Sequence, residues 1–238
     1  MGCATQKKEE PLTPATVEKQ IYDQAQERIK TGNFSMAIDS LENLERRFPF
    51  GKYAEQAQAE LIYVYYENRL YDSAVVAAER FISLHPRHPN TDYAYYMKGL
   101  AKFSKEKELL STVPILGELT YKRDLTKAKE SFDELTEFLE RFPDSNYAED
   151  AKRRMLFLRD LIAKQELEVA EFYIERKAYI AAISRIDFLI SNLPDSPLIK
   201  RALEIKVQAY DFMGKKDLKN QAAEVLKRFI KASEKNSN

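Results

Sequence analysis

The sequence predicts an all-α fold of about five antiparallel helix pairs, or ten helices. Glycine is scarce, with 6 of 238 residues, and 32% of the residues are charged. This composition favours helices over alternating strands. An apolar helical pattern also ends four times at a residue followed by proline, at Pro49, Pro86, Pro143 and Pro194. Because proline lacks a backbone N–H and restricts the residue before it, each of these prolines separates two repeats.

Small side chains recur inside the predicted repeats. Ala37, Ala74 and Ala182 each lie 12 residues before one of the prolines, and an aromatic residue precedes each alanine by three positions. A small residue here lets two antiparallel helices approach closely, and the aromatic residue fills the turn between them. The pattern resembles the tetratricopeptide repeat, a helix-turn-helix unit of about 34 residues, and predicts a tetratricopeptide-repeat superhelix.

Helix boundaries follow from local start and stop signals. Thr13 is expected to cap the first helix and Pro14 to occupy its first turn. Glycine is expected to end the first helix near Gly32 and the ninth at Gly214. In chain order the predicted helices cover about 14–30, 34–48, 53–68, 71–84, 92–104, 124–142, 147–176, 179–193, 197–213 and 217–233. The seventh is too long for a single repeat helix, because no breaker interrupts it.

The predicted organisation has three parts. Residues 1–13 form a flexible N-terminal tether, residues 14–146 form repeats 1–3, and residues 147–234 form repeats 4–5, joined by the long helix 147–176. An insertion at 105–123 interrupts the third repeat. Two interpretations of it stay open: either its apolar residues fold back on the array, or the segment has a function of its own.

The single cysteine, Cys3, lies outside every helical pattern. One cysteine cannot form a disulfide within the chain, and N-myristoylation is disfavoured because Gln6 stands where that motif has serine or threonine. We therefore interpret Cys3 as the lipid-accepting cysteine of a bacterial lipoprotein whose signal peptide has been removed; the alternative is an incidental chain end. Attachment to a membrane would then depend on the lipid anchor alone, since no run of about 18 apolar residues occurs.

Charge and motifs exclude several classes of protein. The chain has 38 basic and 38 acidic residues, and neither half is strongly basic, so no nucleic-acid partner is expected. No glycine-rich phosphate loop and no nucleophile motif occurs. His85 and His88 flank a proline that prevents helical ligand geometry, so we expect them to cap helix ends rather than to bind a metal. We therefore predict no enzymatic activity, no catalytic residue, no metal and no cofactor.

Aromatic residues are denser in the first helices of the early pairs than packing requires. Tyrosine offers a large amphipathic contact area at low conformational cost. Mapped on the repeat, six aromatic residues face the concave side: Tyr22, Tyr63, Tyr66, Tyr93, Tyr96 and Phe103. We expect them to form a groove for an extended peptide or substrate with aromatic or apolar side chains. The alternative is that some of them pack between repeats.

Three segments carry a closer resemblance: 47–66, 88–100, which contains D-Y-A-Y-Y-M-K-G-L at 92–100, and 154–176. They are similar to the BamD family, the tetratricopeptide lipoproteins of the outer-membrane β-barrel assembly machinery (the BAM complex). The similarity spans about residues 16–229 and includes the lipid cysteine. The 92–100 segment and the long helix are its more specific parts, whereas the lysine-rich last helix departs from the family pattern.

The resemblance implies an outer-membrane lipoprotein on the periplasmic face, without enzymatic activity. It implies three partners: the POTRA domains of the barrel-inserting subunit, accessory lipoproteins of the complex, and unfolded outer-membrane protein substrates. Substrates are expected at the N-terminal repeats and the POTRA domains at the C-terminal repeats. Arg185 matches a family arginine on the POTRA side, where an exposed guanidinium suits an interfacial salt bridge.

Three other classes of protein compete with this interpretation. Periplasmic repeat proteins that partner the Tol system carry similar turns, but they begin with a coiled coil and lack a lipid cysteine. A cell-wall enzyme with helical repeats would need a catalytic carboxylate or nucleophile in a cleft. A cytoplasmic cochaperone would need a basic groove, for which Lys19 and Lys30 alone are weak support.

Overall fold

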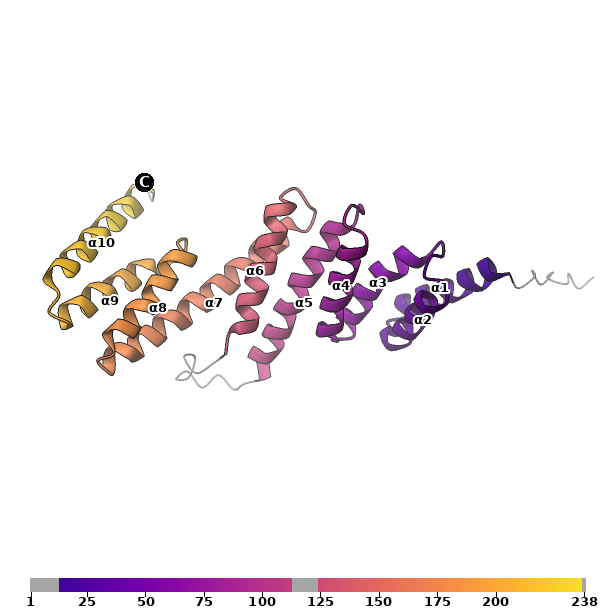
Figure 1. Ribbon diagram of the computed structural model, residues 1–238, viewed down its shortest axis with the longest axis horizontal. Coiled ribbons are helices and arrows are strands. Elements are labelled where there is room, and N and C mark those ends of the chain that lie inside the picture. The colour runs from indigo at the N-terminus through magenta and orange to yellow at the C-terminus, as the bar shows by residue number, and fades with distance from the viewer. Residues whose placement is uncertain (1–12, 113–123, 237–238) are drawn as a thin grey trace, which may run out of the picture. The chain divides into compact units, whose positions relative to one another are not determined.

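The computed structural model describes residues 13–112 and 124–236, and every regular element in these residues is a helix. Figure 1 labels the helices along the chain. Their bounds are α1 (Pro14–Lys30), α2 (Phe34–Arg47), α3 (Ala54–Glu67), α4 (Tyr71–Leu84), α5 (Thr91–Thr112), α6 (Thr126–Arg141), α7 (Ala148–Glu175), α8 (Tyr179–Asn192), α9 (Ile199–Phe212) and α10 (Lys216–Asn236). The prediction of an all-α chain with ten helices is confirmed in the described residues.

The turn inside a helix pair ends the first helix with a residue in the left-handed conformation. Four residues do this, with φ between 59° and 72°: Gly32, Arg69, Lys177 and Gly214. The N–H of the next residue then bonds back to the last helical turn, as from Asn33 to the carbonyl oxygen of Arg28 over 2.8 Å. Recurrence of one turn geometry is what a helix-turn-helix repeat predicts.

The turns between successive pairs form at the four prolines. In each of them the N–H two residues after the proline donates to the carbonyl oxygen of the residue before it, over 3.0–3.1 Å, as from Gly51 to Phe48. The second helix of each pair has ended by then, since α2 stops at Arg47 and α8 at Asn192. The predicted role of the prolines as boundaries between repeats is confirmed.

Helix α5 is longer than predicted. It continues to Thr112, so 105–112, the first part of the predicted insertion 105–123, is helical. The reason is local, because K-E-K-E-L-L are strong helix formers and the next proline is Pro114. Residues 113–123, with the apolar side chains that were candidates for folding back, lie outside the described residues.

The helices group into two compact units, which we describe separately. Unit 1 contains Met1–Glu108 and Glu134–Ala151, and unit 2 contains Leu109–Asp133 and Lys152–Asn238. Helix α6 and the 28-residue α7 contribute residues to both units. The predicted grouping into repeats 1–3 and repeats 4–5 stays a prediction.

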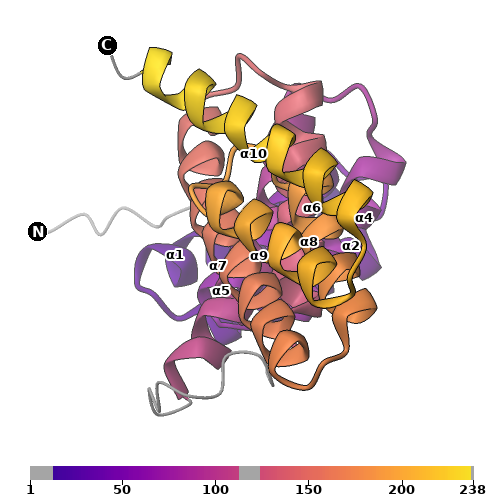
Figure 2. The same ribbon diagram turned by 90° about the vertical axis from the view of Figure 1, so that its left-hand side faces the viewer.

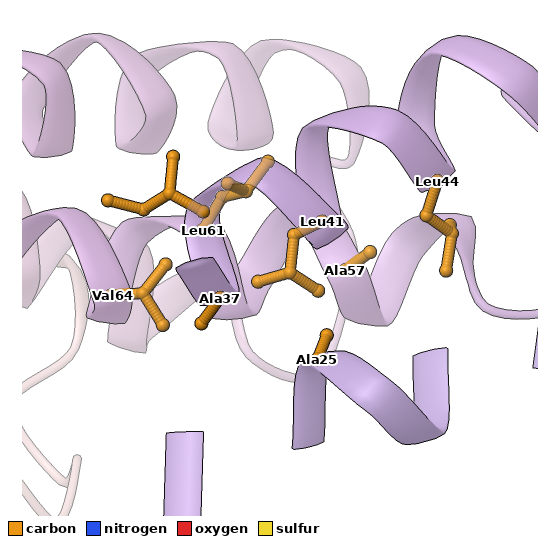
Figure 3. Packing of buried hydrophobic residues seen from close by; sticks show 8 residues of the cluster. Ala25, Ala37, Leu41, Leu44, Ala57, Leu61 and Val64 are labelled. Carbon is orange, nitrogen blue, oxygen red and sulfur yellow. The ribbon is translucent and has the colours of Figure 1, made fainter. Parts of the chain in front are cut away.

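The core at the start of unit 1 lies between α1, α2 and α3. Figure 3 shows alanines of the three helices facing one another, with larger aliphatic residues beside them. Ala25, Ala37, Ala57, Leu41 and Val64 are each 0% exposed. The alanines allow the backbones to approach, and the leucine and valine fill the space that remains. Ala37 therefore has the packing role that the repeat pattern predicted.

Unit 2 also packs alanines at helix contacts with larger aliphatic residues beside them. Helices α8 and α9 pack together, as do α9 and α10, and Figures 1 and 2 both show α9 and α10 side by side. Ala182 and Ala209 are fully buried, together with Ile186 and Leu189. Among the described helices of either unit, none has both the length and the apolar character needed to cross a bilayer.

The contact between α5 and α6 in unit 1 depends on a glycine. A Cβ atom at Gly99 would lie 2.6 Å from Cδ2 and 2.9 Å from Cγ of Leu135, a side chain that is 0% exposed. We expect Gly99→Val to lower the free energy of unfolding by about 2 kcal/mol, because overpacking a rigid core outweighs the small gain in helix propensity. Urea denaturation followed by circular dichroism measures this.

The double variant Gly99→Val/Leu135→Ala is the control for that prediction. If the valine acts by displacing Leu135, its cost should shrink when Leu135 is truncated, so the two losses should not add. Additive losses would contradict the overpacking explanation.

Candidate functional site

A cavity of unit 1 has a volume of about 560 Å³. Its lining comes from α1, α3, the start of α5 and the turn before α7. It consists of Gln26, Ile29, Gln56, Ala59, Glu60, Tyr63, Pro89, Asn90, Asp92, Tyr93, Asn146 and Tyr147. The first helices of successive pairs, together with the turns that precede them, therefore form one aromatic and polar surface.

Glu60 of α3 is the most heavily hydrogen-bonded group in this cavity. Its Oε1 accepts from the hydroxyl of Tyr22 over 2.8 Å and from Nε2 of Gln56 over 2.8 Å. Its Oε2 accepts from Nε2 of Gln26 over 2.5 Å. Three neutral donors hold the carboxylate in place without neutralising it.

Asp92 is the second carboxylate of the cavity. Its Oδ2 accepts from the hydroxyl of Ser145 over 2.6 Å, and its Oδ1 accepts from the N–H of Tyr93 over 2.7 Å. The described lining contains no lysine or arginine, so the cavity has an excess of negative charge. Such a cavity favours a ligand that is uncharged or basic over one that carries carboxylates.

Tyr63 and Tyr93, both predicted for the groove, lie in this cavity. Tyr63 is 38% exposed, and its ring meets the edge of Phe34 at a centroid distance of 6.1 Å. Burial raises the pKa of Tyr93, and the charges of Glu60 and Glu67 raise it further. Burial also raises the pKa of Tyr63. Both phenols therefore stay protonated and available as hydrogen-bond donors at neutral pH.

Tyr22 lies next to the cavity lining and contacts one of its residues, Glu60. Its ring stacks on Tyr53 at a centroid distance of 4.5 Å, while its hydroxyl holds Glu60. The pKa of Tyr22 is raised by burial, and the hydrogen bond to Glu60 and the charge of that carboxylate raise it further. Tyr22 therefore orients a lining carboxylate and is not itself part of the lining.

The structure does not bring the other three predicted aromatic residues into the cavity. Tyr66 hydrogen-bonds through its hydroxyl to Oγ of Ser104 over 3.0 Å. Tyr96 and Phe103 are each 7% exposed, and the hydroxyl of Tyr96 donates to Asp150 over 2.6 Å. Residues 96 and 103 lie on the side of α5 that packs into the core, so mapping by repeat position placed them on the wrong face.

Sequence reasoning missed the polar lining residues. Asn90 and Asn146 belong to the turns that follow prolines, where asparagine is common for turn formation alone. Tyr147 stacks on Tyr96 at a centroid distance of 4.7 Å and completes the cavity wall. The one usable signal was position, because Asn90 directly precedes α5, which carries the predicted Tyr93.

A second candidate site lies in unit 2 around Arg185. Glu166 of α7 is 2% exposed and pairs with both Lys129, at 2.7 Å, and Arg185, at 3.3 Å. Lys129 also lies over the ring of Phe188 at 4.7 Å. A cavity of about 320 Å³ is lined by Lys129, Glu166, Tyr173, Ala181, Ser184, Arg185 and Phe188.

The charges of this second site do not cancel. Two cations share one carboxylate, which leaves one positive charge in excess at a surface where the side chain of Arg185 is 46% exposed. Because Glu166 holds the guanidinium from one side only, the other donors of Arg185 stay available to an incoming acceptor. The sequence-based expectation of an exposed Arg185 agrees with this placement.

The described residues contain no group of three or more histidine, cysteine or acidic side chains arranged to hold a metal ion. Nδ1 of His88 accepts from the N–H of Asn90 over 3.0 Å, one residue before α5 begins. Nε2 of His85 contacts Oε1 of Gln58 at 2.7 Å. Cys3 lies outside the described residues.

Paired helices with recurring turn geometry define this chain as a helical-repeat protein of the tetratricopeptide type. A family model described as YfiO, outer membrane lipoprotein, matches residues 14–226. The chain therefore belongs to this family of outer membrane lipoproteins.

Curated relatives are similar over most of the chain. A protein of Vibrio cholerae is 36% identical over 216 residues, which cover 91% of this chain and 88% of that one. A protein of Neisseria meningitidis serogroup A is 35% identical over 228 residues, covering 94% and 85%. A protein of Xylella fastidiosa strain Temecula1 is 35% identical over 225 residues, covering 94% and 76%. Each of the three is called outer membrane protein assembly factor BamD.

Proposed function

We propose that this chain is a non-enzymatic subunit of the outer-membrane β-barrel assembly machinery, anchored by a lipid on Cys3 to the periplasmic face of the outer membrane. The observation that carries the proposal is the similarity to assembly factors over most of both chains, with 36% identity to the Vibrio cholerae protein. Membership of a family of outer membrane lipoproteins supports the anchor. Accessory lipoproteins of the complex are further partners in this proposal.

The test of this role is a pull-down from detergent-solubilised membranes, with the full-length precursor expressed under its own signal peptide. A large outer-membrane β-barrel protein with POTRA domains should co-purify, and mass spectrometry should find Cys3 acylated. Recovery of Tol-system partners alone would favour the other periplasmic scaffold class and overturn the assembly role.

In this proposal the cavity of unit 1 takes extended segments of unfolded outer-membrane protein substrates. Its volume of about 560 Å³ lies within the range of typical ligand sites. Its tyrosines offer rigid aromatic contacts. Its side-chain amides can donate hydrogen bonds to a peptide backbone and accept them from it, and its carboxylates can accept them. The negative lining favours segments that carry no carboxylate.

We expect Tyr93→Ala to weaken peptide binding about tenfold, because a half-buried aromatic residue at the centre of a site contributes much of its affinity. The probe is a short fluorescent peptide that alternates tyrosine with glutamine and ends in arginine, measured by fluorescence anisotropy. Replacing its arginine with glutamate should weaken binding further.

Tyr66→Ala is the matched control for the cavity, because Tyr66 belongs to the same predicted set but lies outside the lining. Its affinity should stay close to that of the wild type. Equal losses in the two variants would remove the cavity as the peptide site.

In the same proposal Arg185 contacts the POTRA domains of the barrel-inserting subunit. Reversing the charge with Arg185→Glu should weaken the association about tenfold, because it removes a cation from the interface and places a carboxylate beside the buried Glu166. Isothermal titration against the isolated POTRA domains measures this.

Arg201→Glu is the control for that titration. Arg201 is also an exposed arginine of unit 2 and pairs with Glu171 at 2.8 Å, but it lies outside the cavity around Arg185. The control should bind like the wild type. Unchanged affinity in Arg185→Glu would remove this residue from the interface.

A further inference from the structure

The turn between α2 and α3 exposes an aromatic side chain completely. Phe50 follows Pro49 and is 100% exposed, although the turn itself is closed by the hydrogen bond from Gly51 to Phe48. The other three proline turns carry a charged residue at the same position, namely Arg87, Asp144 and Asp195. The turn geometry therefore does not require an aromatic residue at position 50.

Three cations lie within four residues of Phe50 in the sequence. Arg46, Arg47 and Lys52 are exposed, and none of them has a carboxylate within 4.0 Å among the residues that the structure describes. Their visible contacts are with neutral groups: Arg46 with Oδ1 of Asn43 at 3.4 Å, Arg47 over the ring of Phe48 at 5.5 Å and Lys52 over that of Tyr53 at 5.6 Å. Residues 46–52 therefore combine an exposed aromatic residue with three cations and contain no carboxylate of their own.

This turn is held against the beginning of α1. Oε1 of Glu18, a residue that is 6% exposed, accepts from the N–H of Tyr53 over 2.8 Å. The same carboxylate occupies the space in which a side chain at Gly51 would lie. Glu18 lies about one helical turn after Pro14, where α1 begins. The exposed turn is therefore fixed close to the point at which the N-terminal segment enters the fold.

The chain between Cys3 and α1 is short. Ten residues, numbers 4 to 13, separate the cysteine from Pro14. Ten residues can span at most about 35 Å. A lipid on Cys3 would therefore keep the turn within a few tens of ångströms of the membrane surface.

We propose that residues 46–52 form a membrane-contact surface, in which Phe50 enters the interfacial region of the bilayer and the three cations meet anionic phospholipid headgroups. This rests on the proposed lipid anchor. Aromatic rings favour the interface between headgroups and acyl chains, and each cation near an anionic surface strengthens binding about fivefold. A second contact beside a lipid anchor strengthens attachment and limits how unit 1 turns at the surface.

The composition of the chain permits a direct test. It contains no tryptophan and one cysteine, so the full chain with Phe50→Trp carries a single tryptophan, which can be excited selectively, and couples through Cys3 to a maleimide lipid. The vesicles contain phosphatidylethanolamine, phosphatidylglycerol and a brominated phospholipid. The emission of the tryptophan should shift to the blue and be quenched by the brominated chains.

Phe212→Trp is the matched control, because Phe212 is 54% exposed and belongs to unit 2. Its emission should stay unquenched on the same vesicles. Quenching at both positions would indicate general adsorption and overturn the proposal, as would the absence of quenching at position 50. A shift at position 50 only after addition of the barrel-inserting subunit would assign the turn to a protein partner and equally overturn it.

The role of the cations is tested with uncoupled chain and the same anionic vesicles by flotation. The triple variant Arg46→Gln/Arg47→Gln/Lys52→Gln should bind about 100-fold more weakly, since three contributions of about fivefold multiply. The control triple variant Lys200→Gln/Lys227→Gln/Lys231→Gln removes three exposed lysines elsewhere and should bind like the wild type. Equal losses would contradict the proposal.

These experiments separate the two proposals. Coupling at Cys3 is chemical, and the first measurement is made before any assembly partner is added, so failure at position 50 removes only the membrane-contact surface. Failure of acylation or of co-purification in cells removes the anchor or the assembly role and leaves the vesicle results unaffected.

Discussion

Phe138→Ala is expected to lower the free energy of unfolding by about 3–5 kcal/mol. The side chain is 0% exposed and lies among aromatic rings, with centroid distances of 5.8 Å to Tyr96 and 6.0 Å to Phe142. Truncation loses the transfer free energy of the ring and leaves a cavity between rigid neighbours that cannot collapse into it. Urea denaturation followed by circular dichroism measures the loss.

Phe50→Ala is the matched control, because the same atoms are removed from a side chain that is 100% exposed. Its effect on stability should stay within about 0.5 kcal/mol. A loss below about 1 kcal/mol in Phe138→Ala would mean that α6 is not anchored in the core by this ring.

Glu134→Gln should lower the free energy of unfolding by about 3 kcal/mol at neutral pH, because it removes the counter-charge of two nearly buried lysines. The carboxylate pairs with Lys98 and Lys102, each at 2.5 Å, and the three side chains are 15%, 13% and 17% exposed. The glutamine keeps the shape of the side chain but removes the negative charge that Lys98 and Lys102 share.

The ion pairs of Glu134 with Lys98 and Lys102 make the free energy of unfolding depend on pH. Burial raises the pKa of Glu134, but the hydrogen bonds and charges of Lys102 and Lys98 outweigh it, so the pKa is lowered from its ordinary value of 4.5. Because the folded state holds the carboxylate ionised, its stabilisation is complete above pH 4.5 and is lost as the pH falls through the lower, folded-state pKa. The difference between wild type and Glu134→Gln should therefore vanish in acid.

Glu137→Gln is the control for Glu134→Gln. Glu137 lies one turn further along α6 and pairs with Arg141 at the surface, where the two side chains are 39% and 56% exposed. Its loss should stay below about 1 kcal/mol at every pH, since exposed ion pairs contribute little. Similar losses in both glutamate variants would contradict the central role of Glu134.

The repeat architecture was predictable because its signals are local. Proline stops, alanines at close helix contacts and aromatic residues directly after the turns within pairs each depend on chemistry within a few residues. The left-handed turns at Gly32 and Gly214 were predictable for the same reason. Those at Arg69 and Lys177 were not, because nothing in an arginine or lysine marks a positive φ.

The candidate sites were predictable only in part. Periodicity placed Tyr63 and Tyr93 at accessible positions, and the family resemblance singled out Arg185. Periodicity also assigned Tyr96 and Phe103 to the groove, whereas the structure buries both. The position of a residue within a repeat predicts which face of the helix carries it, but not which residues contact it. The direction of a single side chain depends on the helices that pack around it.

The sequence by itself determined the helices, their pairing, the repeat boundaries and the family of this protein, since each depends on short-range patterns or on similarity along the chain. Only the tertiary structure decided which polar groups meet: Glu60 with its three donors, Glu166 between Lys129 and Arg185, and Glu18 against the Phe50 turn. The partners in these contacts are 19 to 38 residues apart in the sequence. The exception is Gln56, which lies four residues before Glu60. Charge and burial at such contacts depend on how the folded helices approach one another, which no local pattern records.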